Sequence, residues 1–76
     1  MNKEKRARLK EAIGFIERAS DIIETVRDEE QDAMDNMPES LQSSDRYSDM
    51  EDAVDSLDSA VDSLSEAQSS VEEAIG

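Results

Sequence analysis

The sequence predicts an all-α protein, an antiparallel hairpin of two long helices joined by one turn. Three observations carry this prediction. Apolar residues recur every three or four positions in the first half of the chain, a seven-residue repeat fills the second half, and Pro38 interrupts the pattern between them. With 76 residues the chain is expected to form a single domain, residues 1–76, whose core is marginal unless further surface is buried.

The first helix is expected over residues 4–36. Phe15 and Ile22, seven positions apart, lie at one edge of its apolar stripe and make that stripe wider than one partner helix covers. The stripe itself is formed by Leu9, Ala12, Ile13, Ile16, Ala19, Ile23, Val26, Ala33, Met34 and Met37.

The turn is expected over residues 37–48. Pro38 disfavours helical geometry at Met37 and has no amide N–H to donate, and the Ser and Asp residues that follow it compete for backbone groups. A short helical turn is expected over residues 38–41, immediately after the first helix.

The second helix is expected over residues 49–75. Ser48 and Glu51 form a capping-box pair just before an apolar run, and Ser44 is a competing start. The heptad repeat then places large side chains at two core positions and alanines beside them. The first core position holds Met50, Leu57, Leu64 and Val71, the second holds Val54, Val61, Gln68 and Ile75, and the alanines are Ala53, Ala60, Ala67 and Ala74.

Matching rows of small residues are expected to set the register of an antiparallel, coiled-coil-like hairpin with an alanine-rich seam. The polar Gln68 at a core position is expected to fix register and partner number. The predicted pairs, each with residue numbers that sum to 86, are Ala33 with Ala53, Val26 with Ala60, Ala19 with Ala67, and Ala12 with Ala74.

Two helices cannot enclose a core, so the pattern also predicts assembly. Phe15 and Ile22 form the expected apolar interface of a homodimer that closes into a four-helix bundle. The alternative is a monomer that docks this apolar face on a different protein.

Charge is unevenly distributed along the chain, whose net charge is −13. Residues 1–27 hold seven Lys or Arg and five Asp or Glu, whereas residues 28–76 hold one Arg and sixteen Asp or Glu. Such an acidic surface repels nucleic acid and anionic membranes and favours basic protein surfaces.

An acidic face is expected on the second helix, opposite its core positions, with carboxylates roughly 5–6 Å apart along the axis. This spacing resembles that of phosphates along a DNA strand, so the face suits the basic groove of a nucleic-acid-binding protein. The alternatives are a face that only keeps the protein in solution and the surface of a salt-adapted protein. The residues of this acidic face are Asp52, Asp55, Asp58, Asp62, Glu66 and Glu73.

The chain contains no Cys and no His, which removes disulfides, thiolate metal sites and imidazole acid–base chemistry. We therefore expect a protein that is not an enzyme and has no cofactor, catalytic residue or metal site. A remote alternative is a magnesium-dependent all-α nucleotide hydrolase built on Glu29 and Glu30, although Ala33 departs from the E-E-x-x-E pattern of such enzymes. Without that role, Glu30 is expected to pair with Arg27 or with water.

The basic residues at positions 3–10 resemble the start of a signal peptide, but Glu11, Glu17 and Arg18 interrupt the apolar run that would have to follow. No stretch approaches the length of a membrane span. A cytoplasmic location is expected.

Two segments carry a resemblance to a known group: RDEEQDAMDNMPESLQSSDRY (27–47) and MEDAVDSLDSAVDSL (50–64). Together with the basic start, they resemble small acidic helical proteins of phages and integrated mobile elements of Gram-positive bacteria. The resemblance spans nearly the whole chain, and its PESLQ and DRY portions are the most distinctive. It implies a bacterial host cell and an anti-defence inhibitor. The group is functionally uncharacterised, so no functional residue is carried over.

Overall fold

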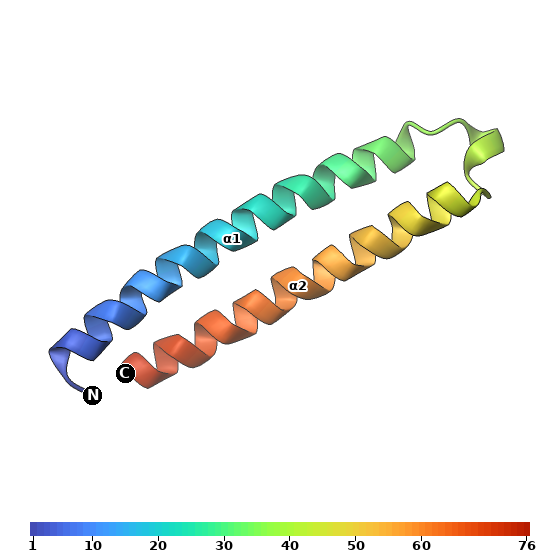
Figure 1. Ribbon diagram of the computed structural model, residues 1–76. Coiled ribbons are helices and arrows are strands. Elements are labelled where there is room, and N and C mark those ends of the chain that lie inside the picture. The colour runs from blue at the N-terminus through green and yellow to red at the C-terminus, as the bar shows by residue number, and fades with distance from the viewer.

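The computed structural model covers all 76 residues and shows two long helices side by side, with both termini at one end (Figure 1). The elements are α1 (Lys3–Asp35), a 3-10 turn η1 (Glu39–Leu41) and α2 (Asp45–Ile75). The Cα trace measures 59 × 14 × 13 Å. The predicted all-α hairpin, with its two helices in contact, is confirmed. Neither helix contains a segment that is both long and apolar enough to cross a membrane.

The ends of α1 agree with the predicted span to within one residue. At its start, the side chain of Asn2 accepts a hydrogen bond of 2.8 Å from the backbone N–H of Lys5. This contact satisfies one of the amides that a helix N-terminus leaves without a partner. At the other end, Pro38 adopts an extended backbone with ψ of 140° and stops the helix, as its sequence position indicates.

The start of α2 was predicted wrongly. The helix begins at Asp45 instead of Asp49, and its cap is Ser44, the competing start. The Ser44 hydroxyl accepts a hydrogen bond from the N–H of Tyr47 and donates one of 2.6 Å to the carbonyl of Leu41. Because this one side chain joins η1 to α2, the helix starts a full turn earlier, and Ser48 lies inside it.

The contact face of α2 follows the predicted heptad. All eight expected core positions are buried or half-buried, from Met50 to Ile75. Tyr47 extends this row by one further position toward the turn and is also half-buried. The row therefore runs along nearly the whole helix at the spacing of a coiled coil.

The contact face of α1 differs from the predicted stripe. It includes four polar residues, Ser20, Arg27, Glu30 and Gln31, each of which is half-buried. Val26 and Ala33, which belong to the predicted stripe, are exposed. A helix can turn only one side toward its neighbour, so α1 cannot bury all of its apolar residues against α2.

The register lies close to the predicted one, but the alanines lie at the edge of the contact. Side chains bond across the helices between Arg27 and Asp58 and between Glu17 and Gln68, and both pairs have residue numbers that sum to 85. In each predicted small-residue pair one member is exposed and the other is half-buried. The larger Leu, Ile, Val and Met side chains occupy the centre and hold the backbones apart. The exposed members are Ala33, Val26, Ala67 and Ala74.

Very little of this structure is fully buried. Met34 and Val54, both near the turn, are the only residues classed as buried. A compact monomer of this mass exposes about 4,700 Å², whereas the hairpin exposes 5627 Å². The hairpin alone therefore exposes more surface to water than a compact monomer of the same mass does.

The Ser44 cap gives a direct test of the corrected boundary. Replacing Ser44 with Ala should lower the free energy of unfolding by about 1 kcal/mol, because the N–H of Tyr47 loses its acceptor. Chemical denaturation followed by circular dichroism at fixed protein concentration measures this change. Ser48→Ala is the matched control and should be close to neutral. An equal or larger loss in Ser48→Ala would contradict the Ser44 boundary.

Candidate functional site

The side chains that flank the helix contact give the hairpin two different long faces. On one side, carboxylates from both helices line a groove. On the other side, apolar and small residues of both helices lie open to solvent. We call the first feature the acidic groove, formed by Glu17, Asp21, Glu24 and Asp28 of α1 with Asp58 and Asp62 of α2.

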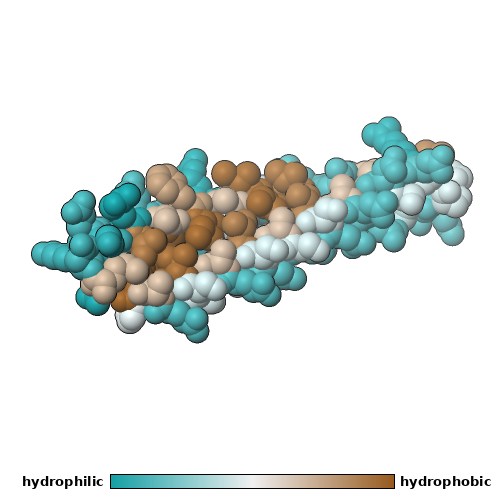
Figure 2. All heavy atoms as spheres, turned by 60° about the horizontal axis from the view of Figure 1, so that its bottom comes forward, coloured by the Kyte–Doolittle hydropathy of each residue, from teal (hydrophilic) through white to brown (hydrophobic).

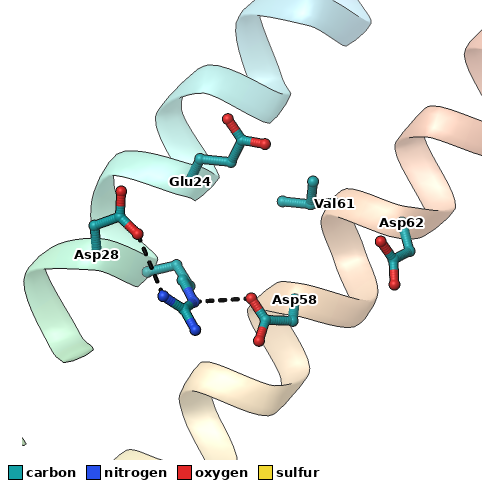
Figure 3. A pocket seen from close by; sticks show the side chains of 6 residues that line it. Glu24, Asp28, Asp58, Val61 and Asp62 are labelled. Atoms are coloured by element: carbon teal, nitrogen blue, oxygen red, sulfur yellow. Dashed lines mark hydrogen bonds and ion pairs between the residues drawn. The ribbon is translucent and has the colours of Figure 1, made fainter.

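The acidic groove is continuous over two adjoining hollows of about 480 and 360 Å³. The two hollows share Glu24, Val61 and Asp62. Figure 3 shows Glu24 and Asp28 on one helix opposite Asp58 and Asp62 on the other, with Val61 between the two rows. The only cation in the lining of either hollow is Arg27, so the groove carries strong negative charge.

Arg27 is the electrostatic centre of this groove. Its Nε donates a 2.8 Å hydrogen bond to Asp58 across the helices, and its Nη1 donates a longer one of 3.4 Å to Asp28 (Figure 3). The hydrogen bond to Asp58 is the main cause that raises the pKa of Arg27 above its ordinary value, against a smaller effect of desolvation. A guanidinium is charged at every pH at which proteins are handled, so the raised pKa adds no pH switch.

Gln68 makes a second polar link between the helices, closer to the termini. Its side-chain amide donates to Glu17 of α1 at 3.1 Å and to Glu72 of α2 at 3.2 Å. The amide is half-buried in the row of otherwise apolar α2 core positions. Both of its donors are used, and they face carboxylates that would otherwise repel one another.

The structure separates the predicted acidic face into two groups. All six of its residues are exposed. Asp58 and Asp62 lie at the acidic groove, and Asp58 forms an ion pair with Arg27 of α1. Of the two partners expected for Glu30, Arg27 or water, Arg27 is excluded, because it pairs with Asp28 and Asp58. The other four, Asp52, Asp55, Glu66 and Glu73, do not line the groove.

The sequence reasoning missed the carboxylates that α1 contributes. Glu17, Asp21, Glu24 and Asp28 follow one another at spacings of four, three and four. That is the spacing of a continuous row beside a helix contact, so the signal was present. This row of carboxylates is less evident in the sequence because the basic residues at the start of α1 offset much of the negative charge of that helix.

The opposite long face is apolar on α1. Phe15 is 65% exposed, Ile22 is 53% exposed and Val26 is 47% exposed. Figure 2 shows hydrophobic side chains gathered on one face of the molecule beside a row of paler, weakly polar ones. Exposed apolar side chains grouped in this way indicate a surface that another molecule covers.

On α2, the same face carries small uncharged side chains from Ala53 onward, which we call the small-residue row; Arg46 and Asp49 hold the equivalent positions near the turn. Helical geometry places these small side chains on the side of the α2 core positions away from Asp58 and Asp62. They alternate Ala and Ser at spacings of three and four, as core positions of a coiled coil do. The row comprises Ala53, Ser56, Ala60, Ser63, Ala67, Ser70 and Ala74.

No group of three or more Asp and Glu side chains comes close enough to hold a metal ion. Comparison with known proteins finds no family model, no curated protein and no solved structure that matches this chain.

The ion pair between Arg27 and Asp58 predicts an energetic coupling. In a double-mutant cycle, Arg27→Gln and Asp58→Asn should cost less together than the sum of their separate effects, because either change alone already breaks the bond. Urea unfolding of the four proteins measures the coupling, which should shrink in high salt. The control cycle pairs Arg27→Gln with Asp55→Asn. Equal coupling in the two cycles would show that Arg27 senses only the general negative charge.

Proposed function

We propose that this chain is a non-enzymatic binding protein whose acidic α2 surface engages a basic surface on another protein. The observation that carries the proposal is the shortage of internal partners for its carboxylates. Of 21 Asp and Glu side chains, only Asp28 and Asp58 form an ion pair, both with Arg27. The remaining negative charge is therefore free to attract a cationic partner.

The arrangement of the charges supports a partner with an extended basic groove. No Lys or Arg follows Arg46, so α2 carries negative but no positive side chains from Tyr47 to its end. A helix holds successive carboxylates at a fixed rise of about 1.5 Å per residue, which preorganises them as a linear array. Binding to such an array follows the rules of phosphate contacts, with fast association and strong salt dependence.

In this proposal the protein acts as an inhibitor that mimics DNA. It occupies the basic, nucleic-acid-binding surface of a protein of the bacterial host, in the setting of a phage or mobile element. Asp58 and Asp62 lie where the acidic surface of α2 meets the groove, so a basic side chain docked there reaches carboxylates of both helices. The groove thereby adds a second row of charge to the row on α2.

A second proposal concerns assembly: two hairpins form a homodimer that closes into a four-helix bundle. It rests on the open apolar face, where Phe15, Ile22 and Val26 are about half or more exposed. Burying apolar surface stabilises a protein by about 25 cal/mol per Å². The single hairpin does not gain this stabilisation from its open apolar face. The two proposals are compatible, because the acidic groove and the apolar face lie on opposite sides of the helix contact.

Charge neutralisation tests the binding proposal. Asp55→Asn, Asp58→Asn and Asp62→Asn in one chain should remove most binding to proteins that the wild type captures from a bacterial lysate at low salt. Duplex DNA should also displace those proteins from the wild type, because it competes for the same basic surface. Quantitative pull-down and titration of the captured proteins provide the measurement.

The matched control removes three negative charges from the far end of α1, by Glu29→Gln, Asp32→Asn and Asp35→Asn. This variant has the same net charge as the α2 variant and should retain binding. Equal loss in both variants would show that net charge alone attracts the captured proteins. Binding that survives the α2 changes would refute the role of the acidic face.

Replacing Ile22 with Glu tests the assembly proposal. A carboxylate in the middle of the apolar face would be buried without a partner, so the dimer should dissociate about tenfold more readily or worse. Sedimentation equilibrium measures the dissociation constant. Leu41→Glu, at a similarly exposed position in η1, is the control and should leave the dimer unchanged. A wild-type chain that stays monomeric at high concentration would exclude the homodimer.

A further inference from the structure

We infer that a second copy of the chain covers the apolar face in one specific arrangement, in which α1 of each copy packs antiparallel on α2 of the other. This inference rests on the proposed homodimer and specifies its geometry. The two-fold axis runs parallel to the helices, so the turns of both hairpins lie at the same end. Large side chains of α1 then enter the small-residue row of the opposite α2.

Shape is the first argument. On the open face, α1 presents the bulky Phe15, Ile22 and Val26, whereas α2 presents alternating Ala and Ser from Ala53 to Ala74. Large side chains pack best against small ones across an interface, because the layers then interdigitate without voids. Stacking α1 on α1 would instead oppose bulky residues, and stacking α2 on α2 would leave only small ones in contact. The crossed pairing matches large with small on both sides of the axis.

Register is the second argument. A two-fold axis parallel to the helices keeps every residue at its own height, so α1 meets the opposite α2 with the same number relation as within one hairpin. Since that relation is a sum near 85, Val26 lies level with Ala60 of the second copy and Ile22 lies level with its Ser63. Phe15 lies level with Ser70 of the second copy. All three bulky residues therefore meet members of the small-residue row without any adjustment.

Charge is the third argument, and it selects between the possible arrangements. Helix α1 holds seven Lys or Arg and ten Asp or Glu, a net charge of −3, whereas α2 holds one Arg and ten Asp or Glu, a net charge of −9. The crossed arrangement places each α2 beside two α1 helices and diagonally across from the other α2. Stacking the two α2 helices on each other would bring the two most negative elements into contact, which costs free energy.

At the border of the interface the arrangement brings one pair of opposite charges together, whereas the equivalent positions one and two heptads away oppose Glu11 to Glu73 and Asp32 to Asp52. Arg18 of one copy and Glu66 of the other lie at nearly the same height, on the outer flanks of the α1–α2 contact between copies. These flanks correspond to the positions at which coiled coils form ion pairs between helices. Neither Arg18 nor Glu66 forms an ion pair within its own hairpin.

The available area is sufficient for a stable dimer. The Cα trace of one hairpin measures 59 × 14 × 13 Å, so each long face has an area on the order of the 800 Å² per partner that stable interfaces bury. The acidic groove remains open on the outside of such a bundle. The inferred dimer would therefore present two acidic surfaces on opposite sides.

Disulfide trapping between separate chains tests the arrangement. The protein has no cysteine, so Val26→Cys and Ala60→Cys can be made as two single-cysteine chains, each checked for helicity by circular dichroism. When the two chains are mixed and oxidised, the mixed disulfide should exceed either homodisulfide about tenfold, since a disulfide needs Cα atoms within about 7 Å. The control mixture, Glu24→Cys with Asp62→Cys, places both cysteines on the acidic groove and should give no mixed disulfide.

Each outcome bears on the inference. A dominant Val26–Ala60 mixed disulfide supports it. Self-linking of an Ile22→Cys chain, without the mixed product, would show that α1 packs on α1 and would overturn the inference while leaving the homodimer intact. Monomeric wild-type protein in sedimentation would overturn the homodimer as well and indicate that a different protein covers the face. Binding to basic proteins through α2 can be measured in every case and is unaffected by these outcomes.

Discussion

The contact between α1 and α2 is the constraint on which the rest of the structure depends. Each helix can bury only one side against the other, and two helices cannot surround a core. Consequently only Met34 and Val54 are buried, and both long faces of the hairpin remain open. What distinguishes this chain is that the two faces have opposite character, one lined by carboxylates and one apolar. Function must be sought on those faces, because nothing lies enclosed between the helices.

Helix α1 must both pack against α2 and contribute side chains to the two open faces. Its contact with α2 includes Arg27, while the apolar Val26 beside it is left exposed. A polar residue in a helix contact reduces stability but fixes register and orientation when it finds a partner, and Arg27 finds Asp58 across the contact. Turning Arg27 toward α2 also turns Val26, Ile22 and Phe15 to the other face. One rotation of α1 therefore both completes the acidic groove and creates the apolar face.

Much of the fold was predictable from the sequence, and the exceptions have physical causes. The heptad of α2 specified its contact face because large apolar residues occupy nearly every core position. The start of α2 was misplaced because Ser44 and Ser48 both have capping chemistry, and only the contact of Ser44 with η1 decides between them. The stripe of α1 was too wide to reveal which side faces α2. The carboxylates that α1 adds to the groove were missed for a different reason, because basic residues at the start of α1 offset much of its negative charge.

A single hairpin leaves part of its apolar surface exposed. The most direct test of this claim is whether the thermal stability of the wild-type protein depends on protein concentration. If a second copy covers the apolar face, unfolding is coupled to dissociation, and the midpoint temperature must rise as the concentration increases. Thermal unfolding followed by circular dichroism over about a hundredfold range of concentration makes this measurement. The structure predicts a steady rise of the midpoint by several degrees. A midpoint that does not change with concentration would show that the hairpin is stable alone, with its apolar face open to water.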